Sequence, residues 1–286
     1  MTAGRRPVAV PPVEVVSDAT RRSLARHEAR VAALAGRRFV DLGDAVLVHD
    51  EGSTEPWRTW LGDVRWPADT AAFDARLVEA FAMFATMDRR PCIWVEHGTS
   101  RPRDLADRLA RDGFIAAEFA YRMWLRRADA DGFVEATRVP SALDVSVHAG
   151  GARDDLDLAA AADAAADVLS VAFRVSHAAV AAEVRRGLAV DGGSLVVVRS
   201  GRTVVGAGRS FRLGRTAYLS AIGVGPKWRS RGIGRLVTAI LADRTFRQGC
   251  SRVHLGVDVG NEPAWRAYAS LGFRAVGPPA SRFILR

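Results

Sequence analysis

The chain repeats its own pattern at a fixed distance, and this repeat restricts the possible folds more than any other feature. A Gly-Phe pair of the kind that ends a helix occurs at Gly113-Phe114 and again 159 residues later, at Gly272-Phe273. Glycine is the residue that most readily takes the left-handed conformation after a last helical turn. Because 286 residues are about twice the length of a common domain, two related domains in tandem fit this repeat.

The same shift of 159 residues aligns segments further upstream. It places the apolar helical stripe that begins at Phe73 on the helix that follows Gly232, and it places the strand-like run Cys92–Val95 on residues 251–254. An offset shared by two helices and one strand predicts a repeated fold. The alternative is chance periodicity in alanine-rich helices.

Hydrophobic periodicity divides both halves into helices and strands. The expected helices are 20–35, 70–84, 102–111, 155–172, 178–188, 233–248 and 262–268. The expected strands are 39–48, 57–66, 92–95, 118–125, 144–148, 195–199, 204–211, 217–224, 253–259 and 282–285. Between the halves lies a charged stretch without periodicity, so the sequence predicts an α/β protein with domains at 1–127 and 143–286 and a linker at 128–142.

Composition excludes several classes of protein. The net charge is +9, but all except one of the 41 basic residues are arginines spread along the whole chain, which is typical of solvated surface charge rather than of a nucleic-acid site. The first apolar stretch is broken by Pro7, Pro11, Pro12 and Glu14, and no long uncharged apolar segment follows. The two cysteines stand in no metal-binding spacing. We therefore expect a cytoplasmic protein with no metal, no membrane and no nucleic-acid partner.

The most informative motif is Arg229-x-x-Gly232-x-Gly234, which follows a strand and opens a helix. The first N–H groups of a helix have no partner within the helix and attract anions, and glycines let a phosphate approach because they have no Cβ. Arg231 and Arg235 add positive charge. The pattern differs from the dinucleotide-binding glycine motif, and it lacks the lysine and hydroxyl of a P-loop. It predicts a phosphate site, although glycine-rich turns before helices are common.

A second cluster at a suitable distance makes the motif specific. It reads Asn261-x-x-Ala264-x-x-x-Tyr268 and ends at the second Gly-Phe pair. Together the two clusters resemble the GNAT superfamily of acyl-CoA-dependent N-acyltransferases, over roughly the second half of the chain. The resemblance implies the GNAT fold, a mixed and mostly antiparallel sheet flanked by helices, with acetyl-CoA as co-substrate.

The resemblance also assigns roles to residues. The pantetheine arm would bind the backbone of the strand before the loop, and the pyrophosphate would bind the amides of the loop and first turn. The implied cofactor-binding residues are Ile222, Gly223, Val224, Arg229, Ser230, Arg231, Gly232, Ile233, Gly234, Arg235 and Asn261. Tyr268 matches the tyrosine that protonates the departing thiolate, with a core tyrosine as the alternative, and Asn261 is equally suited to cap its helix.

The general base is not assigned by the sequence. Relatives often carry a glutamate on the strand before the loop, yet Ala217–Val224 has no carboxylate. Asp258 on the next strand is the nearest acidic candidate for a catalytic role, followed by His177, Glu262 and the hydroxyl of Ser220. Loss of the amine proton to solvent through a water chain is the alternative, and we favour it.

The first half lacks the motif. Under the shift of 159 residues, Gly232 falls on Phe73, Gly234 on Ala75 and Tyr268 on Leu109. The sequence thus predicts a degenerate GNAT-like domain followed by an active one. The expected reaction is direct transfer of an acetyl group to a primary amine of a small molecule or peptide, by a monomer or homodimer. A non-catalytic acyl-CoA sensor and an interaction protein are the alternatives.

Overall fold

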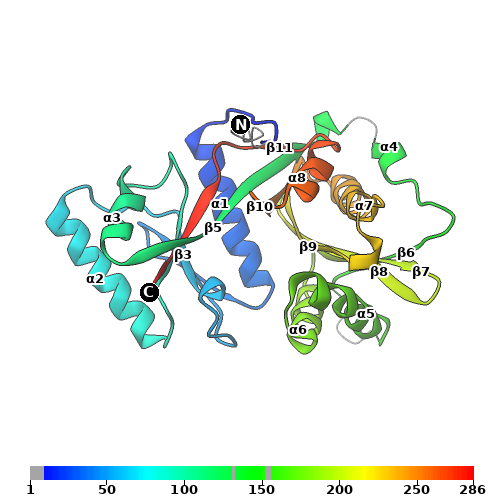
Figure 1. The fold of residues 1–286 in the computed structure, drawn as a ribbon, viewed down its shortest axis with the longest axis horizontal. Helices are drawn as coiled ribbons and strands as arrows, with labels where there is room; N and C mark the ends of the chain where they lie inside the picture. The colour runs from blue at the N-terminus through cyan, green and yellow to red at the C-terminus, as the bar shows by residue number, and fades with distance from the viewer. Residues whose placement is uncertain (1–9, 131–132, 152–155) are drawn as a thin grey trace, which may run out of the picture.

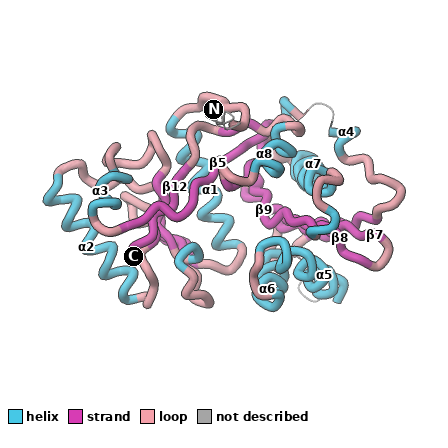
Figure 2. The backbone as a smooth tube through the Cα atoms, in the orientation of Figure 1, coloured by secondary structure: helices cyan, strands magenta, loops and turns pink. Residues whose placement is uncertain are grey.

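The protein is an α/β structure built on one continuous sheet. The computed structural model describes residues 10–130, 133–151 and 156–286. The sheet runs through the whole molecule, and helices cover it on both sides (Figures 1 and 2). Its strand order is β1-β2-β3-β4-β12-β5-β10-β9-β8-β7-β6, and β11 pairs with β5 outside this path. No helix in these ranges has the length and apolar character that a membrane crossing requires.

The first half forms one end of the sheet. Its helices are α1 (Asp18–Leu34), α2 (Thr70–Thr86) and α3 (Leu105–Arg111), with a 3-10 turn η1 at Pro56–Arg58. Its strands are β1 (Arg38–Asp41), β2 (Val46–His49), β3 (Trp60–Gly62), β4 (Cys92–Val95) and β5 (Phe114–Arg126). The Asp69 carboxylate accepts a hydrogen bond from the Ala72 N–H, as expected for an N-cap of α2. The expected strand 57–66 is shorter in the structure because η1 occupies its start.

The second half forms the other end. Its helices are α5 (Leu156–Phe173), α6 (His177–Leu188), α7 (Ile233–Arg247) and α8 (Glu262–Ala269), with a 3-10 turn η3 at Pro226–Trp228. Its strands are β6 (Asp144–Ala149), β7 (Gly193–Ser200), β8 (Thr203–Leu213), β9 (Thr216–Val224), β10 (Arg252–Asp258), β11 (Arg274–Ala275) and β12 (Ala280–Leu285). Strands β6 to β9 pair antiparallel in chain order and form a meander.

The stretch predicted as a linker contains helical structure in its described part. It holds a 3-10 turn η2 at Arg127–Asp129 and a helix α4 at Phe133–Ala136. Phe133 is buried, and its ring lies 6.2 Å from that of Phe246 on α7. A single turn of helix is too short to produce a periodic pattern, which is why the sequence did not indicate it.

The repeat is visible in the strand pairing. Strands β1 to β4 pair in the same order as β7 to β10, and the last pair of each set is parallel while the others are antiparallel. Both Gly113 (φ 88°) and Gly272 (φ 90°) follow a helix in the left-handed conformation, as the Gly-Phe pairs predicted. The two halves share one topology.

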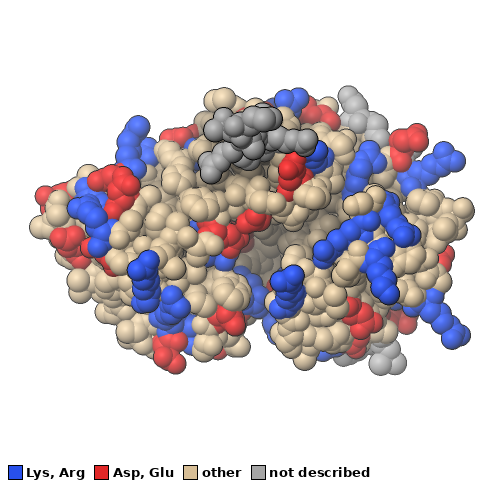
Figure 3. All heavy atoms as spheres, in the orientation of Figure 1, with Lys and Arg blue, Asp and Glu red and all other residues tan. Residues whose placement is uncertain are grey.

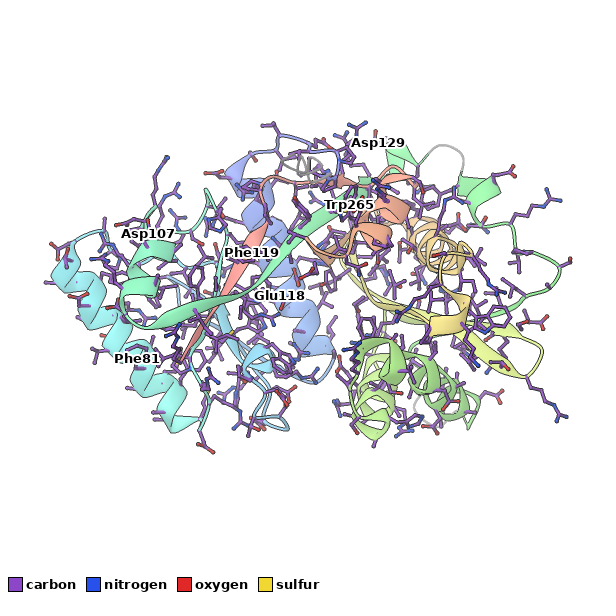
Figure 4. The ribbon with its side chains drawn as sticks, viewed as in Figure 1. Phe81, Asp107, Glu118, Phe119, Asp129 and Trp265 are labelled. Carbon is purple, nitrogen blue, oxygen red and sulfur yellow. The ribbon has the colours of Figure 1, made fainter. Side chains whose placement is uncertain are left out.

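The two halves exchange their final strands. Strand β5 belongs to the first half in sequence but lies between β12 and β10, and β12 from the end of the chain pairs with β4 of the first half. Met123 and Leu125 of β5 are buried in the core of the second half, whereas Phe283 of β12 is buried in the core of the first. Figure 4 shows Glu118 on β5 between the halves, where its carboxylate pairs with Arg282 of β12 at 2.6 Å. The exchange ties the halves into one structure.

Buried polar groups fill the junction between α1 and the second half. The Tyr218 hydroxyl donates to Glu28 at 2.9 Å, and Glu28 also pairs with Arg122 at 2.9 Å. His254 Nε2 lies 2.8 Å from His27 Nδ1, while His27 Nε2 lies 3.1 Å from the Thr216 carbonyl oxygen. If His27 donates to that carbonyl, its Nδ1 accepts from His254 with both rings neutral, and His254 Nδ1 is buried without a hydrogen-bond partner among the described residues. Burial lowers the pKa of both histidines, and for His254 the neighbouring His27 adds to the effect.

This histidine pair predicts a loss of stability in mild acid. The unfolded chain takes up protons as the pH falls through about 6.5, whereas the buried rings resist protonation, so the free energy of unfolding decreases below that pH. Between pH 7 and pH 5, we expect the free energy of unfolding of the His254→Leu variant to decrease by about 2 kcal/mol less than that of the wild type. Urea unfolding at both pH values measures this. His177→Leu removes an exposed histidine and serves as the control; the same pH dependence in all three proteins would contradict the assignment.

Candidate active site

The loop between η3 and α7 presents backbone N–H groups to solvent. Ser230 (φ 60°) and Gly232 (φ 77°) both adopt the left-handed conformation, which turns the chain sharply before Ile233 begins the helix. Among the described backbone bonds, the first that closes a turn of α7 runs from the Leu236 N–H to the Gly232 carbonyl. The amides before it point out of the helix N-terminus, and this arrangement suits an anion.

The surroundings of this helix N-terminus are basic. Arg229 and Arg231 are exposed, and neither they nor Arg235 form an ion pair with any described carboxylate. The Arg231 guanidinium lies 4.9 Å from the Trp228 ring, and Arg235 Nε donates to the Ser270 hydroxyl at 3.2 Å. Basic side chains gather on the face of the molecule that carries α7 and α8 (Figure 3). The uncompensated charge favours a ligand with several negative charges.

Strand β9 separates from its parallel neighbour just before this loop. The ladder between β9 and β10 covers only Thr216–Tyr218 against Arg252–His254, although both strands continue further. A bulge in the β8–β9 pairing lies at the same place, where Ala221 has φ 50°. The bulge bends β9 away from β10. Backbone groups of β9 after the bulge therefore face a gap between the strands rather than a neighbouring strand.

One pocket of about 440 Å³ joins the loop, the strand gap and α8. The predicted cofactor-binding residues that line it are Ile222, Gly223, Val224, Arg229, Ser230, Gly232, Ile233, Gly234, Arg235 and Asn261, and Tyr268 lines it as well. Arg231 belongs to the loop but stands outside the lining, over Trp228. The structure thus brings together residues from two separate sequence clusters.

Tyr268 lies on the inner face of α8. Its side chain is 7% exposed, and no hydrogen bond joins its hydroxyl to another described residue. Burial raises the pKa of Tyr268 to about 12, so the phenol keeps its proton throughout the neutral and mildly alkaline range. A protonated phenol in a pocket can donate a proton to a developing anion. At the start of α8, the Asn261 side chain accepts from the Ala264 N–H at 3.4 Å, which confirms the N-cap. Asn261 also lines the pocket, and its contact with a cofactor stays a prediction.

The carboxylate candidates stand outside this pocket. Asp258 is exposed at the end of β10, where its side chain accepts a hydrogen bond from the Gly260 N–H at 2.7 Å. Glu262 pairs with Arg266 at 2.5 Å, and His177 Nε2 lies 3.0 Å from Asp167 Oδ1. The Ser220 hydroxyl is bonded by Arg209 Nε at 3.2 Å. None of these four groups lines the pocket, so a role for any of them as base remains a prediction.

Sequence reasoning missed several apolar residues of the pocket wall. They are Ala172, Phe173, Trp228, Pro263 and Ala267. Helical spacing would have indicated Ala267, because it follows Ala264 of the second cluster by three residues and shares a helix face with it and with Tyr268. Phe173 ends a helix that is distant in sequence, and no local pattern predicts its approach to β9.

The corresponding place in the first half is built differently. The residues that match the loop at 229–232 are 70–73, and they form the first turn of α2. One amide of that turn is already bonded by the Asp69 carboxylate, and Phe73 is buried. At the N-terminus of α2 the Asp69 carboxylate bonds a free amide, whereas the N-terminus of α7 leaves room for a ligand.

The comparisons with known proteins agree with this geometry. The model of the Acetyltransferase (GNAT) family matches residues 163–273, which include the whole pocket from Ala172 to Tyr268. This region is a GNAT domain. The N-alpha-acetyltransferase RimI of Mycobacterium tuberculosis is 41% identical over 96 residues, which are 32% of this chain and 59% of that protein. The chain therefore matches little more than half the length of this relative.

Solved structures share the fold over nearly the whole chain. A GCN5-related N-acetyltransferase from Kribbella flavida has a TM-score of 0.63 at 19% identity, covering 90% of this chain and 94% of that one. A tandem GNAT protein from the clavulanic acid biosynthesis pathway has a TM-score of 0.61 at 14% identity, covering 84% and 77%. Matches of this extent include both halves. The GNAT fold is therefore present in tandem, although the family model reaches only the second half.

Proposed function

We propose that the protein transfers an acetyl group from acetyl-CoA to a primary amine by direct attack. The observation that carries the proposal is the single pocket that collects the free amides of α7, the unpaired edge of β9 and the Tyr268 phenol. Neither cysteine lines this pocket, and both are buried, which favours a reaction without a thiol intermediate. The acceptor is a small molecule or a peptide, and we expect the protein to act in the cytoplasm.

The pocket residues fit the parts of acetyl-CoA. Amides 230–235 and Arg229 would hold the pyrophosphate, and the β9 backbone at Ile222–Val224 would bond the pantetheine amides. Gly234 faces this pocket without a Cβ, so a phosphate group can approach its backbone closely. The thioester would then lie near the bulge at Ala221, within the gap between β9 and β10.

The chemistry requires two proton movements. The amine nitrogen attacks the thioester carbonyl carbon, the carbon–sulfur bond breaks, and an amide and a thiol are formed. Tyr268 donates the proton that the departing sulfur takes up and recovers it from solvent. The attacking nitrogen loses its own proton to water, since no described carboxylate lines the pocket.

A non-catalytic acyl-CoA sensor is the second candidate. The absence of a carboxylate from the pocket lining favours it, whereas the buried and protonated Tyr268 favours an enzyme. Release of free CoA thiol from acetyl-CoA in the presence of a panel of amines distinguishes the two. Binding without amine-dependent thiol release would identify the sensor.

Binding of acetyl-CoA should occur once per chain, in the second half only. Gly234→Trp fills the space beside Val224 and is expected to abolish binding. Ala75→Trp changes the matching residue of the first half, at an exposed position of α2, and is expected to leave binding intact. Titration calorimetry gives both the affinity and the stoichiometry. Two sites per chain, or equal binding by the two variants, would disprove the assignment of a degenerate first half.

The Tyr268→Phe variant should lose turnover rather than affinity. A proton donor to the leaving thiolate acts in the transition state, and acid catalysis contributes about 10²- to 10⁴-fold, so we expect kcat to fall at least ~10-fold. The dissociation constant of acetyl-CoA should change less than ~2-fold. An unchanged kcat, measured under conditions where chemistry limits the rate, would restrict Tyr268 to packing.

The Asp258→Asn variant tests the route of the amine proton. Because Asp258 is exposed and bonds its own turn, we expect kcat to change less than ~3-fold. The acidic limb of the rate profile should instead follow the pKa of the amine and shift between acceptors of different basicity. A large loss of kcat with unchanged acetyl-CoA affinity and folding would identify Asp258 as the base.

A further inference from the structure

A second pocket of about 250 Å³ lies beside the first, at the junction of the two halves. Leu169, Phe173 and Val180 of α5 and α6 contribute to its apolar wall, while Glu183 and the arginines at positions 58 and 209 form its charged wall. Figure 3 shows the molecule hollowed between the halves, with basic side chains along the hollow. The pocket is built by residues from both repeats.

The two pockets meet at the bulge of β9. Phe173 lines both of them, and Ala221 lines the second pocket while Ile222 and Gly223 line the first. A group bound in the second pocket therefore lies next to the place proposed for the thioester. This position makes it the place from which an acceptor amine reaches the reacting carbon.

The charged wall depends on the first half. Arg58 of η1 reaches across the junction, where its Nη1 donates to Glu183 Oε2 at 2.7 Å and its Nε donates to Asp50 Oδ2 at 2.8 Å. Arg209 of β8 also pairs with Glu183 and donates to Ser220. A third guanidinium, that of Arg37, lies 3.6 Å from Asp50 and 4.0 Å from Glu183.

This network holds more positive than negative charge. Three guanidinium groups face two carboxylates, and Nη1 of Arg209 is buried without a hydrogen-bond partner. Burial alone would raise the pKa of Glu183, but Arg209 and Arg58 hold it well below its usual range, so Glu183 stays ionised and is a poor base. Burial is the main cause that lowers the pKa of Arg37, and the neighbouring Arg58 adds to it. A further anion would relieve the excess of positive charge.

We propose that this pocket binds the acceptor and selects a small amine that carries a carboxylate and an apolar side chain, as in a free apolar amino acid, with Arg58 as a specificity-determining residue. The inference rests on the proposed function. The volume equals that of roughly eight water molecules, which suits a molecule of this size rather than a folded protein surface. The apolar wall receives the side chain, the arginines receive the carboxylate, and the amine faces the bulge.

Leucine and leucinamide form the matched pair of probes, since they differ in the carboxylate alone. We expect Arg58→Gln to lower kcat/KM for leucine at least ~10-fold, mainly through KM, and to change it less than ~2-fold for leucinamide, as the loss of a charge-assisted hydrogen bond predicts. The two amines differ in basicity, but this difference is the same for every variant. It therefore cancels when the ratio of kcat/KM for leucine to kcat/KM for leucinamide is compared between variants. Arg185→Gln, on the exposed side of α6, should leave the ratio unchanged.

A second variant tests the same charge wall with less risk to folding. Arg58→Gln leaves Glu183 and Asp50 with fewer partners, whereas Arg37→Gln removes a positive charge that makes no hydrogen bond shorter than 3.5 Å to them. We expect Arg37→Gln to lower the leucine-to-leucinamide ratio of kcat/KM about 3-fold or more, while the melting temperature stays unchanged. Loss of the preference in both variants supports the proposal. An equal effect on both probes in Arg37→Gln overturns it.

Calorimetric binding of leucine and leucinamide separates this inference from the proposed function. Carboxylate-selective binding that is lost in Arg58→Gln supports the pocket even if no acetyl transfer occurs. No binding of leucine, or equal binding of both probes, overturns the inference even if other amines are acetylated. Acetylation of the terminal amine of a leucine-initiated peptide amide in preference to leucine would likewise overturn it. Failure to bind acetyl-CoA would instead contradict the proposed function.

Discussion

The exchange of final strands between the two repeats is the constraint on which the rest of the structure depends. Because β5 lies between β12 and β10, each half completes its sheet only with a strand from the other. The side chains of β5 are divided between two cores, with Phe114 in one and Leu125 in the other. The exchanged strands place the two halves side by side, and across this junction Arg58 of one half lies at hydrogen-bond distance from Glu183 of the other.

The sequence predicted the local structure well where a physical signal lay within a few residues. The left-handed glycines Gly113 and Gly272, the N-cap Asn261 and the strand β12 all lie where turn chemistry or periodicity placed them. The candidate pocket could be predicted equally well, because its two sequence clusters each follow a strand and these strands are neighbours in the sheet. The solved structures with the GNAT fold confirm the architecture that these signals indicated.

Pairings between distant segments were beyond the reach of the sequence. The sequence predicts β5 and β12 as ordinary strands, and their composition does not indicate which strands they pair with. Arg58 and Glu183 are 125 residues apart and look like surface charges in isolation. The arginines were interpreted as solvated and dispersed, yet Arg58 and Arg209 form a partly buried network, because burial depends on tertiary contacts that residue type does not reveal.

The first half has structural roles at this junction. At the place that corresponds to the loop of α7, Asp69 bonds an amide of α2 and Phe73 is buried, and we predict that no phosphate binds there. It contributes Arg58 to the second pocket and His27, which is hydrogen-bonded to His254 Nε2. A partly buried ion network costs desolvation energy that well-packed apolar residues would avoid. The network lies beside the bulge of β9, next to the place proposed for the thioester, and this position fits the proposed role in recognising an acceptor better than a role in stability alone.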